Sequence, residues 1–331
     1  MKLNLSLFWI ALLCLITPIA SKNSNCSSTQ AFVDNTPTTT LSYSQHEPIV
    51  ISSNRDWINQ GWPGNGTKNH PFLVHELDIE TFSIGIGIYN TTVYFMINEC
   101  RISSLEPSQN PGILLSNVTH GVIRSCIAES RKTALDVSNA SSCYLIENEA
   151  YNNLANGFKI VQSDNCVLAN NTSVDNADDG FYLSGENCVV TNCAAVDNGD
   201  DGFHIVFSDN CTLKENRAMR NGNTGVAVAG EESNLIYLNR LGYNNDTNGS
   251  DRGGGSQWDN GTHGNFWSDY IGFGQYTVPG DAGSVDHYPR QLSPGIHPMA
   301  IAIVIGGVGV AAAISLGIYV KTRGQPEFAR Y

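Results

Sequence analysis

Apolar residues in the middle of the chain stand two positions apart in short runs, and the runs return about every 23 residues. Such alternation is typical of β-strands, in which successive side chains point to opposite faces. Glycine, asparagine, aspartate and serine separate the runs, and these residues tolerate the backbone conformations of tight turns. No repeat shows the i, i+3, i+4 spacing of an amphipathic helix. The pattern predicts short strands joined by turns.

Each repeat opens with a small residue. The opening positions are Gly112, Ala134, Gly157, Gly180, Gly202 and Gly225. A repeat this short cannot bury a core alone, so the repeats must stack as the coils of a solenoid. Three short strands per coil, stacked in parallel, predict an all-β fold: a parallel β-helix of about seven coils of 22–23 residues, with a cap at each end.

Stacking at about 4.8 Å would place equivalent residues of successive coils above one another. One inward column consists of aromatic residues, namely Phe158, Phe181 and Phe203. A second consists of cysteines, namely Cys143, Cys166, Cys188 and Cys211. Parallel Cβ vectors suit the disulfide dihedral poorly, so we expect buried free thiols. A turn column consists of asparagines whose amides can bond from coil to coil, namely Asn148, Asn171, Asn192, Asn216 and Asn239.

One outward column mixes chemistries that suit a ligand. It contains Asp136, Lys159, Tyr182 and His204. Beside it, two pairs of carboxylates precede the opening glycines of successive coils, namely Asp178 with Asp179 and Asp200 with Asp201. Tyrosine, lysine and histidine can contact sugar rings and their carboxylates, and stacked carboxylates can hold Ca²⁺. A solvated turn with no ligand is the alternative, since Asp-Asp-Gly is an ordinary turn sequence.

The two ends of the chain indicate export and membrane anchoring. Residues 1–20 contain a lysine, a short apolar run and small residues near a cleavage point, as in a signal peptide. Residues 299–320 contain no charge and are long enough to span a bilayer as one C-terminal transmembrane helix. Lys321 and Arg323 follow at once, so residues 321–331 should be a cytoplasmic tail. The sequence predicts a single-pass type I protein of the cell membrane with its β-helix outside.

Composition divides the intervening chain. We expect a Ser/Thr/Asn-rich stalk over 21–46, an N-terminal cap with the first strands over 47–84, and β-helix repeats over 85–250. A cap rich in glycine and aromatic residues should follow over 251–290, with a linker over 291–298.

Charge and sequons agree with an exposed location. The net charge of −13 argues against nucleic acid as a partner. The sequons at Asn65 and Asn90 are candidate glycosylation sites because they fall outside the asparagine columns.

Two segments resemble a known family. Residues 258–270 read Trp-Asp-Asn-Gly-Thr-His-Gly-Asn-Phe-Trp-Ser-Asp-Tyr, similar to the terminal motif of NosD-like right-handed β-helix proteins. The start of the body, Gly61-Trp62-Pro63-Gly64-Asn65-Gly66-Thr67, is similar to archaeal-type cell-surface members of that group. The resemblance implies a right-handed coil, export, and a role in copper-site maturation or in carbohydrate binding and processing. The acidic stretch of many members is here Gly272-Phe273-Gly274-Gln275, which lacks their calcium ligands.

These observations favour a membrane-anchored surface scaffold or carbohydrate-binding module, with a polysaccharide or another surface protein as partner. A polysaccharide lyase or hydrolase acting on an anionic glycan is an alternative, and would need the outward column to lie in a cleft. A NosD-like copper accessory is a second alternative. Copper needs soft or imidazole ligands held together, whereas this chain has 4 methionines and 8 scattered histidines, which argues against it.

The predicted orientation can be tested on intact cells. Protease added outside should digest the β-helix and leave the tail from Lys321 bound to the membrane. Immunoblotting with antibodies against the body and against the tail measures the result. Protection of the body in intact cells, with digestion only after lysis, would contradict the type I orientation.

Overall fold

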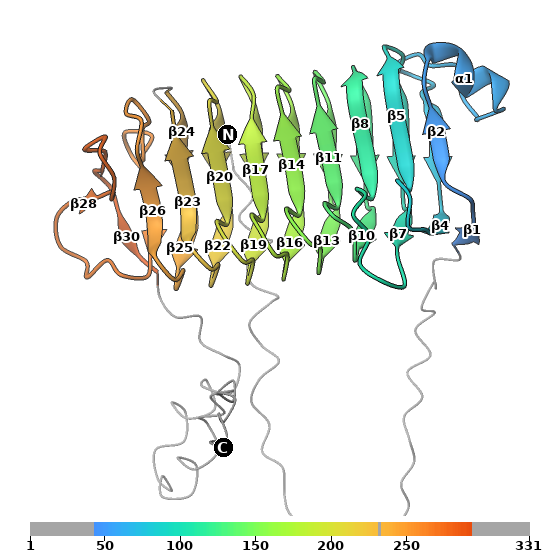
Figure 1. Cartoon of the computed structure of the whole chain (residues 1–331). Coiled ribbons are helices and arrows are strands. Elements are labelled where there is room, and N and C mark those ends of the chain that lie inside the picture. The colour runs from blue at the N-terminus through green and yellow to red at the C-terminus, as the bar shows by residue number, and fades with distance from the viewer. Residues whose placement is uncertain (1–42, 231–232, 293–331) are drawn as a thin grey trace, which may run out of the picture. The chain divides into compact units, whose positions relative to one another are not determined.

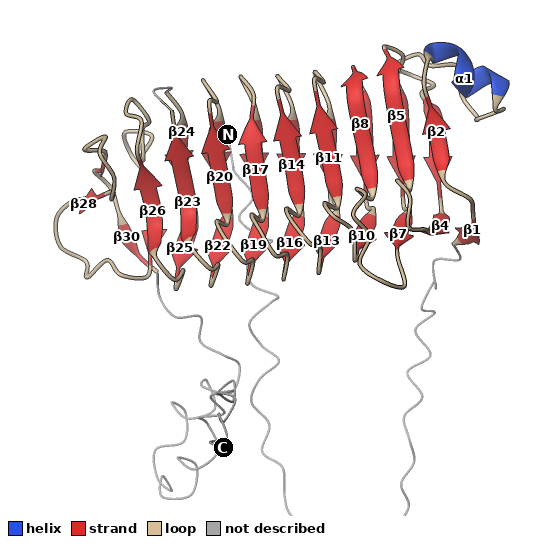
Figure 2. Cartoon of the chain, viewed as in Figure 1, coloured by secondary structure: helices blue, strands red, loops and turns tan. Residues whose placement is uncertain are grey.

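The computed structural model describes residues 43–230 and 233–292, which form a parallel β-solenoid. Within these residues the chain winds through three parallel sheets, and each coil adds one strand to each sheet in turn (Figures 1 and 2). The nine-stranded sheet has the order β2 (Ile49–Ile51), β5 (Ile86–Thr91), β8 (Ile113–Val118), β11 (Leu135–Ser138), β14 (Phe158–Val161), β17 (Phe181–Ser184), β20 (Phe203–Val206), β23 (Thr224–Ala229) and β26 (Thr247–Asp251).

The other two parallel sheets complete each coil. The eight-stranded sheet consists of β3 (Phe72–His75), β6 (Phe95–Asn98), β9 (Gly121–Arg124), β12 (Tyr144–Ile146), β15 (Val167–Ala169), β18 (Val189–Thr191), β21 (Thr212–Lys214) and β24 (Leu235–Tyr237). The eleven-stranded sheet consists of β1 (Ser44–Gln45), β4 (Leu77–Glu80), β7 (Arg101–Ser103), β10 (Ile127–Glu129), β13 (Glu149–Tyr151), β16 (Thr172–Val174), β19 (Ala194–Val196), β22 (Arg217–Met219), β25 (Arg240–Gly242), β27 (Phe266–Trp267) and β30 (Arg290–Gln291). An antiparallel pair, β28 (Tyr276–Thr277) and β29 (Val285–Asp286), lies near the C-terminal end.

The solenoid has about nine coils, so the predicted number of about seven is too low. The predicted stacking of equivalent residues is confirmed from Ile113 to Val226. The repeat spacing did not predict the additional coils, because insertions make the first coils longer than the regular repeat. Ile49 pairs with Ile86, and Ile86 with Ile113, across separations longer than one regular repeat.

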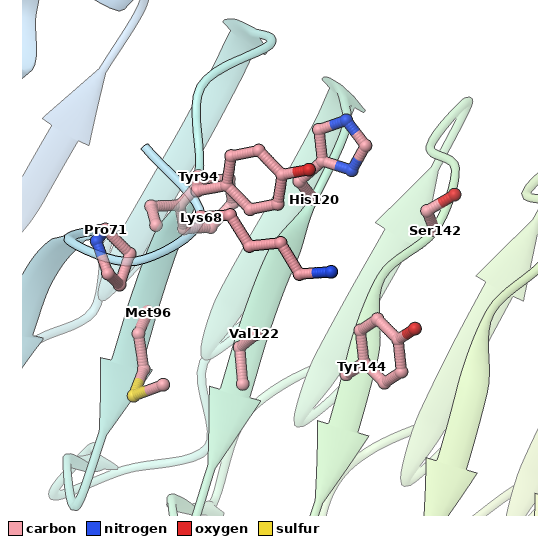
Figure 3. A pocket seen from close by; sticks show the side chains of 9 residues that line it. Lys68, Pro71, Tyr94, Met96, His120, Val122, Ser142 and Tyr144 are labelled. Atoms are coloured by element: carbon pink, nitrogen blue, oxygen red, sulfur yellow. The ribbon is translucent and has the colours of Figure 1, made fainter. Parts of the chain in front are cut away.

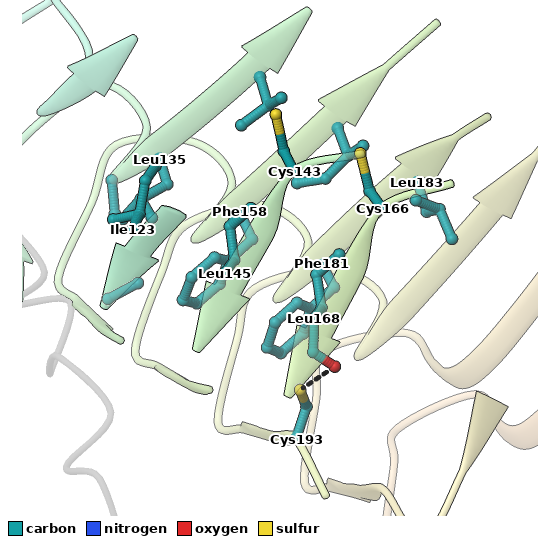
Figure 4. Packing of buried hydrophobic residues seen from close by; sticks show 14 of the residues in the cluster. Ile123, Leu135, Cys143, Leu145, Phe158, Cys166, Leu168, Phe181, Leu183 and Cys193 are labelled. Carbon is teal, nitrogen blue, oxygen red and sulfur yellow. Dashed lines mark hydrogen bonds between the residues drawn. The ribbon is translucent and has the colours of Figure 1, made fainter. Parts of the chain in front are cut away.

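The aromatic column forms a continuous stack in the interior. The rings of Phe158 and Phe181 lie 4.6 Å apart at an angle of 6°, and those of Phe181 and Phe203 lie 4.8 Å apart at 8°. All three side chains are buried, and Figure 4 shows Phe158 and Phe181 within the core. Their spacing equals the distance between paired strands, so the backbone register sets the ring stacking.

The cysteines are buried free thiols, as predicted. All seven cysteines of the described residues are free and buried, and Figure 4 shows Cys143 and Cys166 on neighbouring coils. The hydrogen bond with the preceding thiol of the column raises the pKa of Cys166 and of Cys188 to about 12. These cysteines are therefore neutral, small apolar core residues near pH 7.

The asparagine column satisfies the backbone at a corner of each coil. The Oδ1 of Asn216 accepts from the backbone N–H of Cys193 at 2.9 Å, and its Nδ2 donates to the carbonyl of Val190 at 2.9 Å and to Oδ1 of Asn239 at 3.0 Å. Asn148 and Asn171 form the same contact with each other. The prediction that Asn192 belongs to this column is wrong, because Cys193 takes the position.

Tryptophans are buried near both ends of the described region. Trp57 lies in α1 (Asn54–Asn59) and stacks on Phe72 at 5.4 Å, and Figure 1 shows α1 beside β2 at the first coil. Trp258 and Trp267 are buried near the other end. Ser44 and Gln45, which the sequence places in the stalk, instead form β1 and pair with β4.

Several predictions concern residues outside the described region. These are the signal peptide (1–20), the stalk up to residue 42, most of the linker from residue 293, the transmembrane helix (299–320) and the tail (321–331). Among residues 43–230 and 233–292, no helix is long and apolar enough to cross a membrane.

The asparagine column yields a stability prediction. The substitution Asn216→Asp replaces the donor Nδ2 by a carboxylate oxygen that faces two acceptors, the carbonyl of Val190 and Oδ1 of Asn239. We expect it to lower the free energy of unfolding, measured in urea at neutral pH, by about 2–4 kcal/mol. The loss should shrink at acidic pH, where the new carboxyl can be protonated.

Asn192→Asp is the matched control, since Asn192 is exposed and lies one residue before the column. It should change the free energy of unfolding by less than about 0.5 kcal/mol. Equal effects of the two substitutions would show that the column does not stabilise the solenoid.

Candidate functional site

The predicted outward column lies on the nine-stranded sheet. Lys159 of β14 pairs with Tyr182 of β17, which pairs with His204 of β20, and Figure 1 shows these strands as neighbours. Asp136 of β11 pairs with Lys159 on the other side. All four side chains are half-buried. Strand alternation turns them outward while their neighbours Phe158, Phe181 and Phe203 fill the core.

The turn before each of these strands brings aspartates against the next coil. A Cβ on Gly180 would lie 2.7 Å from the carbonyl oxygen of Gly202, so only glycine allows this close approach. The Oδ1 of Asp179 accepts from the backbone N–H of Asp201 at 3.1 Å, and Oδ1 of Asp201 accepts from that of Thr224 at 2.8 Å. Asp179 and Asp201 are therefore buried, whereas Asp178 and Asp200 are half-buried.

The remaining carboxylate oxygens turn toward His204. Its Nδ1 lies 3.3 Å from Oδ2 of Asp179 and 3.6 Å from Oδ2 of Asp201. The His204 side chain is 30% exposed, against 4% for Asp179. The hydrogen bond with Asp179 raises the pKa of His204 above its ordinary value. With Nδ1 bonded to a carboxylate, Nε2 is the nitrogen left to face a ligand.

Burial changes the acidity of the carboxylates. It raises the pKa of Asp201 to about 6. Burial, together with the charges of Asp179 and Asp200, also raises the pKa of Asp178. Asp178 and Asp201 therefore bind protons more readily than ordinary aspartates do.

These side chains line a shallow hollow of about 390 Å³. Its lining residues are Asn156, Lys159, Asp178, Asp179, Tyr182, Asp200 and His204. Asn156 is not among the site residues predicted from the sequence, and its Nδ2 lies 3.2 Å from Oδ2 of Asp179. The signal was present, because Asn156 occupies the position of Asp179 one coil earlier. Asp136 does not line the hollow, and burial raises its pKa despite the charge of Lys159.

Two groups of residues in the described part of the chain have ligand atoms within 4.8 Å of one another. They are Asp178 with Asp179 and Asp200, and Asp179 with Asp201 and His204. Three carboxylates are the hard oxygen ligands that Ca²⁺ takes. Neither group contains a cysteine or methionine, so the soft ligand set favoured by Cu(I) is not assembled there.

The two candidate glycosylation sites are exposed. The Oδ1 of Asn65 accepts from the N–H and hydroxyl of Thr67, and Oδ1 of Asn90 accepts from Asn117.

Chemically, the hollow combines an aromatic ring, a lysine, a histidine held by a carboxylate and a carboxylate cluster. The ring can stack on a sugar, the cations can contact an anionic group, and the histidine can transfer a proton. The side chains with these properties lie next to one another in the hollow.

Comparison with known proteins supports the fold. Residues 84–241 match the family model described as right handed beta helix region, so this part of the chain is a right-handed parallel β-helix. No curated protein matches the sequence.

Solved structures with a similar fold include three carbohydrate-related proteins. Pectate lyase Pel9A is 14% identical, with 76% of this chain and 69% of that chain covered and a TM-score of 0.48. The periplasmic alginate epimerase AlgG is 12% identical, with 75% and 85% covered and a TM-score of 0.40. The mannuronan C-5 epimerase AlgE4 A-module of Azotobacter vinelandii is 14% identical, with 76% and 87% covered and a TM-score of 0.42. At these identities the similarity concerns the fold alone.

The contact between His204 and Asp179 yields a pH prediction. Asp179→Asn removes the carboxylate that most raises the pKa of His204, so the pKa should fall toward its ordinary value of about 6.5. Protonated His204 stabilises the fold below that value, and the stabilisation is lost as pH rises through the raised pKa. In the Asp179→Asn variant this pH-dependent part of stability should shrink.

An NMR titration of the His204 ring protons measures the pKa. Asp136→Asn is the matched control, because Asp136 lies in the same outward column but three strands away from His204. An unchanged His204 pKa in Asp179→Asn, or an equal fall in Asp136→Asn, would contradict the assignment.

Proposed function

We propose that this protein binds an acidic polysaccharide on the outer face of the nine-stranded sheet, in the hollow between Lys159, Tyr182 and His204. The observation that supports the proposal is the alignment of these three side chains on consecutive coils, above the buried Asp179. Since paired strands lie about 4.8 Å apart, the contacts extend along a line, as a linear glycan would require.

Each side chain has a distinct task in this proposal. The ring of Tyr182 packs on the face of a sugar, while Lys159 and protonated His204 contact its carboxylate. The bond to Asp179 favours the protonated form of His204, so binding should weaken as pH rises through that pKa.

A calcium ion would complete the site. Asp178, Asp179 and Asp200 would hold it, with water and the glycan carboxylate as further oxygen ligands. The cation would offset the repulsion that helps raise the pKa of Asp178, and would make binding to an anionic chain compatible with an acidic protein.

The proposal includes location. A cleaved signal peptide and a single C-terminal span would place the β-helix at the cell surface, where it would act as a scaffold that retains polysaccharide or another surface protein. The similarity of residues 258–270 to NosD-like proteins accords with an exported β-helix.

A second function, lyase or hydrolase activity on the same glycan, is favoured by one observation. His204 is held at Nδ1 by a buried carboxylate, the arrangement that prepares an imidazole for general acid–base catalysis. The hollow is shallow, and no long insertion interrupts the coils around it, which favours binding over catalysis.

Binding can be measured by calorimetry with polygalacturonate and alginate, using neutral dextran as a control. The double substitution Tyr182→Ala with His204→Ala should weaken binding at least about tenfold, or about 1.4 kcal/mol, with folding intact because both side chains point outward. Tyr151→Ala, on the eleven-stranded sheet, is the matched control and should bind normally. Unchanged binding by the double variant would refute this site.

Two further arms separate the parts of the proposal. Removal of calcium with a chelator should weaken binding by the wild type, and Asp178→Asn with Asp200→Asn should abolish that calcium dependence. Product analysis after long incubation distinguishes the functions, since a lyase forms unsaturated sugar ends, a hydrolase forms saturated reducing ends, and a binding module forms neither.

A further inference from the structure

A second hollow, of about 450 Å³, lies on a different sheet near the first coils. It opens on the eight-stranded sheet over β6, β9 and β12, and shares no residue with the hollow around His204. Figure 3 shows its side chains converging from these three strands and from the loop before β3. Its volume falls in the range of small-molecule sites.

The floor of this hollow is an outward column of apolar side chains. Met96, Val122 and Tyr144 are in register on consecutive coils. Tyr144 is 44% exposed. The floor therefore presents a partly exposed aromatic ring beside aliphatic groups.

A rigid aromatic pair forms one wall. Tyr94 precedes β6 and His120 precedes β9, and their rings stack at 4.3 Å with an angle of 6°. The coil spacing brings the two rings together, so the stack exists before any ligand binds. A preformed aromatic wall orders few side chains on binding and so costs little entropy.

The loop that carries Lys68 and Pro71 forms a second wall beside Tyr94 (Figure 3). The backbone N–H of Tyr94 donates to the carbonyl of Gly66 at 3.0 Å, which fixes the loop against the wall. A Cβ on Gly64 would lie 2.1 Å from the carbonyl of Pro71, so the loop closes this tightly only with glycine there. The sequence of the loop therefore determines how closely this wall packs against Tyr94.

Lys68 gives the hollow its charge. Figure 3 shows its amino group directed into the space between Tyr94 and Tyr144. No ion pair of Lys68 is found among residues 43–230 and 233–292. The described residues that line the hollow include no aspartate or glutamate. In a chain of net charge −13, this is a local cationic site with aromatic walls.

We propose that this hollow binds one acidic sugar residue of a glycan, independently of the site around His204. The apolar face of the ring lies on Tyr144 and Met96, the Tyr94–His120 pair borders its edge, and its carboxylate contacts the amino group of Lys68. Charge complementarity selects this ligand over a neutral apolar peptide, because the single charged group of the hollow would otherwise be covered without a partner.

The test uses the full-length protein carrying Tyr182→Ala and His204→Ala, so that the site around His204 does not contribute. Trigalacturonate is titrated by calorimetry, with its methyl ester as the neutral probe. We expect saturable binding of trigalacturonate in this background. Lys68→Gln should weaken it about tenfold while leaving the weak binding of the ester unchanged, and Lys68→Arg should restore it. Tyr144→Ala should weaken binding of both probes.

Tyr237→Ala and Lys214→Gln, at the other end of the same sheet, are matched controls and should have no effect. Absence of trigalacturonate binding in the double-variant background would overturn this proposal without affecting the site around His204. Equal binding by Lys68→Gln would also overturn it. A Tyr144→Ala variant that alters only the sedimentation of the protein, with binding unchanged, would assign the hollow to a protein interface instead.

Discussion

The stacking of one coil on the next requires that every backbone group at the buried corners find a partner in the neighbouring coil. Between the strands the chain turns inside the core, where an unpaired N–H would cost about 1–3 kcal/mol. Asn148, Asn171, Asn216 and Asn239 meet this requirement, since each Oδ1 accepts from the backbone of the coil before it. The same bond recurs in these coils, with Cys193 at the equivalent position in the one between Asn171 and Asn216. It holds the coils in register, and the register in turn aligns the outward columns.

The aspartates of the candidate site use the same device in the opposite direction. The carboxylates of Asp179 and Asp201 each accept a backbone N–H from the coil that follows. One oxygen of each is thereby committed to the fold, and the other faces His204. The site is therefore a modified structural corner. This explains why Asp179 and Asp201 are buried instead of lying exposed at the edge of the column, and why burial raises the pKa of Asp201.

The sequence predicted those features that depend on register alone. Like residues one repeat apart lie above one another, so the phenylalanine and cysteine columns and the pairing of Lys159, Tyr182 and His204 followed from the period. It failed where the chain departs from the period. Asn192 has the left-handed backbone conformation of the residue just before the column, and Cys193 occupies the column itself. The repeat length alone cannot decide which of two adjacent residues belongs to the column. The wall formed by Lys68 and the burial of Arg131, which donates to the carbonyls of Thr81 and Ser83, depend on loops that no repeat specifies.

One column of equivalent turn residues shows how titratable groups can be added to a repeated fold. Asn156, Asp179, Asp201 and Thr224 occupy equivalent positions in four successive coils. The ends of this column are neutral, whereas the two middle residues bring carboxylates to buried positions, where burial raises the pKa of Asp201 to about 6. The corner tolerates the charges because backbone N–H groups, an asparagine amide and His204 contact them. Carboxylates at these two coils, where the flanking coils have Asn156 and Thr224, thus preserve the stacking and add titratable groups at one place along the solenoid. At the same coils the outward column holds a lysine, a tyrosine and a histidine. The corner and the sheet face beside it therefore both carry chemically active side chains at this place, as a ligand that contacts both would require.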